Sequence, residues 1–108
     1  MPKITKQDIY DILEDYKLDY EPPDYNFYSK NRLRDISNIR WAVDELEHYI
    51  FRNWGKEAPI DACNSFIVDM NYFMHKYPKT QKEFFTAISV AEDIRDVFIC
   101  SFTKGEHL

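Results

Sequence analysis

The chain has 108 residues, and its 14 lysines and arginines against 19 aspartates and glutamates give a formal net charge of −5 at pH 7. This length suits one domain covering residues 1–108, and 44% hydrophobic with 31% charged residues is a globular composition that excludes wholesale disorder. Two glycines are too few for the many turns of β-sandwiches and barrels, and no apolar run forms a signal peptide or approaches the roughly 20 residues of a membrane span.

The first predicted helix begins after Thr5 and runs to about Leu18. Thr5 suits the N-cap position, and Asp8 complements the positive end of the helix dipole. Apolar side chains then recur at helical spacing, at Ile9, Ile12, Leu13 and Tyr16. The pair Pro22–Pro23 ends this region because neither proline can donate a backbone hydrogen bond. We expect the aromatic segment 25–28 that follows to pack along the other helices.

A second helix is predicted from about Asn31 to Trp54. Its apolar stripe steps by three or four residues throughout, at Leu33, Ile36, Ile39, Val43, Leu46, Ile50 and Trp54. Three further large side chains lie off this stripe, at Trp41, Tyr49 and Phe51. We therefore expect a central helix that is contacted from two sides. Gly55 suits the left-handed position after the helix end.

The third helix is predicted after Pro59, which suits a first helical turn, and it stops at Tyr77–Pro78. Its apolar positions are Cys63, Phe66, Ile67, Met70, Phe73, Met74 and Tyr77. Thr80 and Glu83 then form a capping-box pattern at the start of a fourth helix that runs to about Thr103. The apolar positions of this helix are Phe84, Ala87, Ile88, Ala91, Ile94, Val97, Phe98 and Phe102.

The short connection at 78–79 forces the last two predicted helices into an antiparallel hairpin. In that register Phe73 faces Phe84, Met70 faces Ala87 and Phe66 faces Ala91. The sequence as a whole predicts an all-α fold, a compact four-helix domain with an antiparallel helical hairpin in its C-terminal half.

The two cysteines, Cys63 and Cys100, are predicted to remain reduced. In the hairpin register they are offset along the helix axis by about 9 Å, which is too far for a disulfide. We expect both thiols to lie in the core of a cytoplasmic protein.

A metal site is not expected. Glu45 and His48 form one Glu-x-x-His motif, but carboxylate-bridged metal bundles need two, and Tyr72 stands three residues before His75. Leu46 takes the core position of its turn, so Glu45 and His48 should point outward. The remaining potential zinc ligands are dispersed along the chain, at Cys63, Cys100, His48, His75 and His107.

Enzymatic activity and a cofactor are not expected either. No base is placed to activate Cys100 or Ser101 as a nucleophile. The glycines at 55 and 105 both follow predicted helices, so the chain has no glycine-rich phosphate loop.

Acidic residues concentrate in residues 8–24, where seven carboxylates stand against Lys17 alone. This segment could be a solvated helix face, or it could engage a basic groove of a partner with its tyrosines, Tyr10 among them, adding contact area. On the second interpretation the candidate partner-binding residues are Asp8, Asp11, Glu14, Asp15, Tyr16, Asp19, Tyr20, Glu21, Asp24 and Tyr25.

The next segment, residues 25–34, interleaves aromatic and basic side chains. Such a pattern can hold single-stranded nucleic acid, and the candidate residues are Tyr25, Phe27, Tyr28, Lys30, Arg32 and Arg34. Three cations in an acidic domain are few for this purpose, so direct nucleic-acid binding is disfavoured. The simpler interpretation is that the aromatics pack on the core and the arginines pair with Asp35, Asp44 or the acidic first helix.

Together these features predict a small acidic, non-enzymatic, cytoplasmic protein that binds another protein with a basic surface. We do not expect it to bind a membrane. No motif is specific enough to name a family. A sharper hypothesis within this class is an inhibitor that occupies the basic nucleic-acid groove of an enzyme, as phage-encoded anti-CRISPR proteins do. The alternatives are a single-stranded nucleic-acid-binding module using residues 25–34, and an obligate helical homodimer that buries the apolar surplus of the second helix.

Overall fold

The structure is a computed structural model that describes residues 4–20 and 30–103. Within these ranges it contains four α-helices and no strand, which confirms the predicted all-α fold. The helices are α1 (Lys6–Leu18), α2 (Lys30–Arg52), α3 (Pro59–Lys76) and α4 (Gln81–Phe98). A 3-10 turn (Pro78–Thr80) joins α3 to α4, and a π-helical turn (Ile99–Thr103) extends α4.

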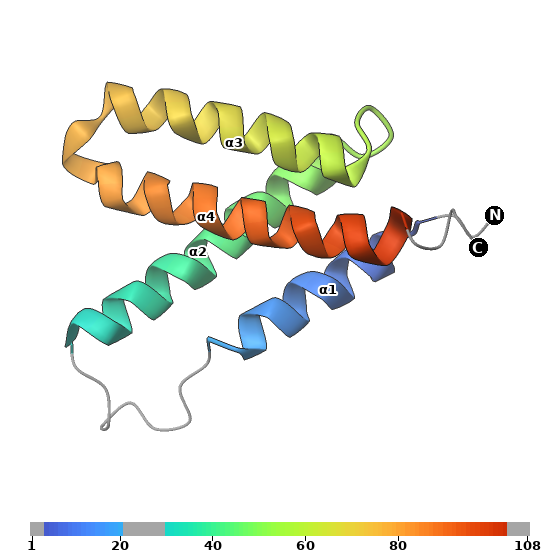
Figure 1. Cartoon of the computed structure of the whole chain (residues 1–108), viewed down its shortest axis with the longest axis horizontal. Coiled ribbons are helices and arrows are strands. Elements are labelled where there is room, and N and C mark those ends of the chain that lie inside the picture. Colours follow the sequence, from blue (N-terminus) through green and yellow to red (C-terminus); the bar gives the residue numbers. More distant parts are fainter. Residues whose placement is uncertain (1–3, 21–29, 104–108) are drawn as a thin grey trace.

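The predicted hairpin is present: α3 and α4 run side by side in opposite directions and form the most extensively packed pair of helices (Figure 1). The rings of Phe73 and Phe84 lie 5.9 Å apart near the connecting turn, which confirms the predicted register at that level. The α2 helix crosses this pair and contacts α1, α3 and α4, as expected for a central helix. The α1 helix packs on α2 and α4, at the opposite edge of the molecule from α3.

The start of α1 is held by a complete capping box. The Asp8 backbone N–H donates to Thr5 Oγ1 at 3.2 Å, and the Thr5 backbone N–H donates to Asp8 Oδ2 at 2.9 Å. Thr5 has the extended backbone that an N-cap needs, with ψ at 162°. The predicted N-cap is thus confirmed, and Asp8 has a second role in addition to its interaction with the helix dipole.

The capping box predicted at Thr80 and Glu83 is wrong. Thr80 has ψ at 21° and makes no side-chain capping bond, because Pro78–Thr80 already forms a 3-10 turn that leads directly into α4. The Thr80 hydroxyl donates instead to the Tyr77 carbonyl at 3.2 Å. The left-handed backbone predicted for Gly55 is confirmed by its φ of 85°, but α2 ends at Arg52, so Gly55 lies in the turn three residues beyond the helix and not at its cap.

The core draws on all four helices. Its fully or almost fully buried members are Ile9, Leu13, Ala42, Val43, Leu46, Ile50, Ala62, Cys63, Phe66, Ala87, Val90, Ala91, Ile94 and Phe98. Val97, which the apolar stripe placed in the core, is exposed, and Val90 is buried in its stead. The reason is that Ala91, Ile94 and Phe98 already define the stripe of α4 that faces the other helices.

The two cysteines differ in environment. Both thiols are free, as predicted, but only Cys63 lies in the core. The predicted burial of Cys100 is wrong: Cys100 is exposed on the π-helical turn, whereas Phe102 of the same turn packs against the core. Burial raises the pKa of the Cys63 thiol to about 12.

None of the helices in the described part of the chain combines the length and apolar content needed to span a bilayer. The aromatic segment 25–28, which we expect to pack along the other helices, lies outside the described residues.

Candidate protein-binding face on α1

The inner side of α1 fixes the helix to the rest of the domain. Ile9 and Leu13 are completely buried, and Ile12 and Tyr16 pack against the same core. These are the four residues that the sequence pattern turns inward. Their placement determines which side chains of α1 remain available to a partner.

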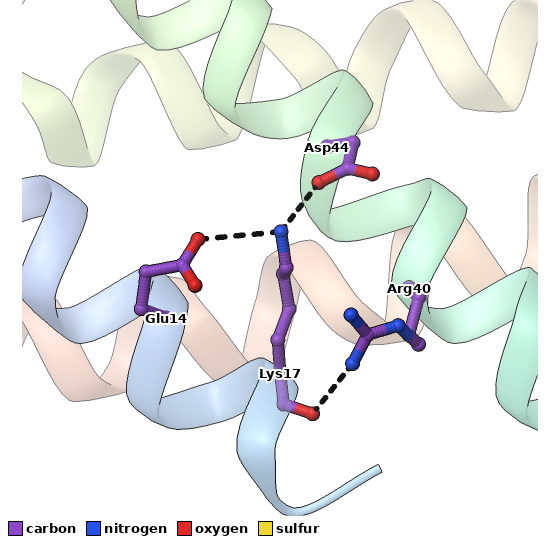
Figure 2. Close-up of polar contacts among 4 residues, drawn as sticks. All are labelled: Glu14, Lys17, Arg40 and Asp44. Atoms are coloured by element: carbon purple, nitrogen blue, oxygen red, sulfur yellow. Dashed lines mark hydrogen bonds and ion pairs between the residues drawn. The ribbon is translucent and has the colours of Figure 1, made fainter. Parts of the chain in front are cut away.

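One flank of α1 is clamped to α2 by Lys17 (Figure 2). The Lys17 ammonium lies 2.8 Å from Asp44 Oδ1 and 3.3 Å from Glu14 Oε1, while Arg40 Nη1 donates to the Lys17 carbonyl at 3.2 Å. The hydrogen bond to Asp44 raises the pKa of Lys17, with burial opposing it and Glu14 adding to the rise. A single cation therefore compensates two carboxylates, and Glu14 is largely engaged within the molecule.

The other anchor of α1 is Tyr16. Its hydroxyl donates to Asp93 Oδ2 of α4 at 3.2 Å, and its ring lies 5.3 Å from that of Tyr20. Burial first, and then Tyr20 and Asp93, raise the pKa of Tyr16 far above its ordinary value. Tyr16 and Tyr20 are both half-buried, so these two predicted partner-binding residues mainly support the position of α1.

The outer side of α1 carries exposed carboxylates next to exposed apolar side chains. Asp8, Asp11, Asp15 and Asp19 are exposed, and none of them forms an ion pair with a described residue. Beside them, Tyr10 is 44% exposed and Leu18 is 62% exposed. We call these six residues the α1 outer face.

The spacing of these residues arranges the carboxylates in one row. Asp11, Asp15 and Asp19 follow one another at intervals of four residues, which puts successive carboxylates about 6 Å apart along the helix axis. Leu18 follows Asp11 by seven residues, about two turns, and lies alongside the carboxylate row, whereas Tyr10 is turned about 100° away from Asp11, toward the flank that carries Lys17. Sequence reasoning missed Leu18, although its position off the inward stripe was a usable signal.

The structure thus brings part of the predicted acidic site together and leaves part aside. Asp8, Asp11, Asp15 and Asp19 share the α1 outer face, whereas Glu14 belongs to the Lys17 clamp. The remaining predicted partner-binding residues, Glu21, Asp24 and Tyr25, lie outside the described residues.

The alternative site in residues 25–34 is mostly outside the described side chains, which exclude Tyr25, Phe27, Tyr28, Lys30 and Arg32. Arg34 is exposed at the start of α2. Two carboxylates that were expected to pair with arginines have other partners among the described residues: Asp35 lies 3.6 Å from Lys82, and Asp44 binds Lys17.

The Glu-x-x-His motif on α2 points outward as predicted, since Glu45 and His48 are both exposed. Among the described residues, no three His, Cys, Asp or Glu side chains lie close enough together to hold a metal ion.

A second exposed face was not predicted from the sequence. Near the connecting turn of the α3–α4 hairpin, Tyr72 is 60% exposed and Phe85 is 61% exposed. Val68 and Tyr77 are also exposed. The Lys76 ammonium lies 5.6 Å from the centre of the Tyr72 ring and 5.5 Å from that of Tyr77. We call these five residues the hairpin-end face.

The sequence did contain a signal for this face. Tyr72–Phe73 and Phe84–Phe85 are adjacent aromatic pairs, and neighbouring residues on a helix point about 100° apart. A helix that buries one stripe therefore exposes one member of each pair. Phe73 and Phe84 face each other, and Tyr72 and Phe85 are left at the surface.

The two faces differ in charge. The α1 outer face is acidic, whereas residues 70–82 of the hairpin contain three lysines and no carboxylate. Comparisons with protein-family models, with curated proteins and with solved structures find no match for the chain.

Proposed function

We propose that this protein is a non-enzymatic binding module whose α1 outer face docks on a basic surface of another protein. The observation that carries the proposal is the combination of uncompensated carboxylates and exposed apolar side chains on one helix. Asp11 and Asp15 have no cationic partner among the described residues, Leu18 is exposed beside them, and Tyr10 is exposed on the flank of the same helix.

Each part of this face has a distinct role in binding. Buried apolar and aromatic anchors supply most of the affinity in protein interfaces, which suits Tyr10 and Leu18. Surrounding charges mainly accelerate association and select the partner. A merely solvated helix face would account for the carboxylates, whereas an interface accounts both for the carboxylates and for the exposed leucine that lies among them.

The partner class that fits best is an enzyme with a basic nucleic-acid-binding groove, which the protein would inhibit by occupying that groove. The row formed by Asp11, Asp15 and Asp19 repeats about every 6 Å along the helix. Such a row offers lysines and arginines a line of negative charge, as a nucleic-acid backbone does.

The proposal is tested with the variant Asp11→Asn/Asp15→Asn. It removes two charges from the α1 outer face while keeping side-chain size, and neither residue lies in the core. A matched control is Glu45→Gln/Asp61→Asn, which removes two exposed carboxylates from α2 and α3. Wild type and both variants serve as bait for partner capture from the source cell, followed by binding kinetics at two salt concentrations.

We expect the Asp11/Asp15 variant to associate more slowly than wild type, by roughly an order of magnitude at low salt, with a smaller difference at high salt. The control should associate like wild type. Equal association rates for all three proteins at both salt concentrations would refute a role for the α1 outer face.

The inhibitor hypothesis needs its own measurement. The captured partner is titrated with a labelled oligonucleotide in the presence and absence of the protein. Competition is expected if both occupy the same groove. A ternary complex of partner, oligonucleotide and protein would reject groove occupation while leaving the binding role of α1 intact.

No specific observation favours either alternative function, the nucleic-acid-binding module or the obligate homodimer. Most residues of the 25–34 segment lie outside the described side chains. On α2, Tyr49 and Phe51 pack against the protein's own core, and Trp41 is 39% exposed, which is a small apolar surplus for an obligate dimer.

A further inference from the structure

We propose that the hairpin-end face binds the α1 outer face of a second copy of this chain, so that molecules associate head to tail. The proposal rests on the same acidic face of α1 as the proposed function, and it adds a specific surface that competes for it. The second copy is then both a partner and a regulator, because a copy docked on α1 excludes any other protein from that face.

The hairpin-end face has the chemistry that an acidic helix requires. Val68, Tyr72 and Lys76 are spaced four residues apart, so they form one exposed stripe along about 12 Å of α3. Lys76 is held in place by the rings of Tyr72 and Tyr77, which reduces the entropy lost when its ammonium binds a carboxylate. A shallow hollow beside it is lined by Asn71, Tyr72, His75 and Lys76.

Two carboxylates, Asp69 and Glu83, flank this region, which contains Lys76, Lys79 and Lys82. Asp69 lies beside the Tyr49 hydroxyl of α2, where burial and then Asp69 raise the pKa of Tyr49. Lys79 is exposed in the connecting turn, and Lys82 at the start of α4 forms an ion pair with Asp35 at 3.6 Å. Lysines thus outnumber carboxylates by three to two between Val68 and Phe85, in a protein that is acidic overall.

The two faces match in length and in composition. The stripe from Val68 to Lys76 and the row from Asp11 to Asp19 each extend over eight residues, about 12 Å. One face offers carboxylates beside two apolar side chains, and the other offers ammonium groups beside exposed rings and a valine. Helix-on-helix packing of this kind buries the apolar groups and pairs the charges around them.

A nucleic acid is a poorer occupant of the hairpin-end face. Sequence-independent binding of single strands depends on bases stacking on open aromatic faces. Here the Lys76 ammonium already lies over the Tyr72 and Tyr77 rings. The edges of these rings remain available to apolar side chains, and the ammonium remains available to a carboxylate.

The arrangement of the helices prevents one molecule from pairing its own two faces. The α1 and α3 helices lie at opposite edges of the molecule, with α4 between them (Figure 1). Each contact between copies therefore joins two different faces. An open assembly has one free α1 outer face at one end and one free hairpin-end face at the other. Such assemblies grow into short chains or close into rings.

The test uses the pure protein and two variants that each remove one face. The hairpin variant is Tyr72→Ser/Lys76→Gln, and the acidic variant is Asp11→Asn/Asp15→Asn. The control Lys56→Gln removes an exposed lysine from the turn between α2 and α3. Molecular mass is measured by sedimentation velocity over a range of concentrations at low and high salt.

We expect the mass of wild type and of Lys56→Gln to rise with concentration and to fall with salt, while each double variant remains monomeric. The decisive sample is an equimolar mixture of the two double variants. It retains one intact face of each kind, so it should form a dimer and nothing larger. Recovery of a dimer from two monomeric variants also shows that both variants are folded.

Three results would overturn the proposal. The first is a wild-type mass that stays monomeric at every concentration, and the second is association of either double variant alone. The third is oligonucleotide binding, measured by fluorescence anisotropy, that wild type shows and the hairpin variant loses. If the mixture stays monomeric, the experiment is repeated with the single variant Lys76→Gln in place of the hairpin variant, after its thermal melting has been shown to match wild type. A mixture that is still monomeric then rejects the pairing. None of these results bears on partner capture by α1, so the proposed function is judged separately.

Discussion

Replacing Phe66 with alanine tests whether the α3–α4 hairpin is the main source of stability. Phe66 is 2% exposed and belongs to the core cluster that joins all four helices. Its ring meets that of Tyr49 on α2 edge-on, with the ring centres 5.7 Å apart. The substitution therefore removes contacts of α3 with its hairpin partner and with the central helix at the same time.

The structure places the loss in the upper part of the usual range. Truncating a buried phenylalanine costs about 3–5 kcal/mol, and an aromatic pair contributes about 0.5–1.5 kcal/mol beyond its buried area. The small side chains of Ala87 and Ala91 in the same cluster cannot extend into the space that is left. We expect a loss of about 4 kcal/mol from a total stability of about 5–15 kcal/mol.

Urea unfolding followed by far-UV circular dichroism measures this loss. With a slope of about 1.5–2 kcal/mol per molar urea, the midpoint should fall by about 2–3 M. Val68→Ala, on the exposed side of the same helix, is the control and should change stability by no more than about 0.5 kcal/mol. A loss below about 1 kcal/mol for Phe66→Ala would show that this packing does not hold the domain together.

Two further predictions concern the helix start and the cysteines. Thr5→Ala should destabilise the protein by about 1 kcal/mol in the same urea assay, because it breaks the capping box. Thr80→Ala should lower the stability clearly less, since Thr80 makes no capping bond. Equal losses of stability for the two variants would contradict the assignment of the caps. A thiol reagent at pH 8 should modify Cys100 in the native protein and reach Cys63 only on unfolding, because burial raises the pKa of Cys63 to about 12. Rapid native modification of two thiols, counted by mass spectrometry, would contradict the burial of Cys63.

The helices themselves followed from local sequence because their apolar stripes and their breaks are local signals. Proline and glycine restrict the backbone wherever they occur, so Pro59, Pro78 and Gly55 marked real boundaries. The two threonine caps show the limit of this reasoning. Thr5 and Thr80 present similar patterns, but the turn before Thr80 fixes its backbone near the helical region, and a capping bond needs an extended one.

Exposure was harder to predict than secondary structure. Periodicity ranks the sides of a helix, but it does not say where a neighbouring helix stops covering them. Tyr77 and Val97 sit on predicted apolar stripes and are nevertheless exposed, and Cys100 is exposed on the π-helical turn. Tyr77 lies at the end of α3, whereas Val97 and Cys100 lie next to Phe98 and Phe102, which do reach the core, so there the side of the helix decides exposure.

The candidate site depended on contacts that sequence patterns do not reveal. The local excess of carboxylates in residues 8–24 was visible from composition. Which of them are compensated depends on pairs far apart in the chain, with 27 positions between Lys17 and Asp44 and 77 between Tyr16 and Asp93. The distant pair with Asp93 anchors Tyr16, and Asp44 holds Lys17 in reach of Glu14, whose i,i+3 spacing to Lys17 was visible in the sequence; Asp11 and Asp15 remain on the surface.

The Lys17 clamp has an electrical consequence for the whole molecule. It compensates Glu14 and Asp44 where α1 meets α2 and leaves negative charge along the outer edge of α1, while three lysines lie near the end of the hairpin. The molecule is 46 Å long, several times the Debye length of about 8 Å at physiological salt, so these opposite charges do not neutralise each other's fields. A basic partner is therefore attracted to the outer edge of α1 from about one Debye length away, before any contact forms. Orientation during the approach, and not only the contacts made afterwards, then contributes to which face meets the partner first.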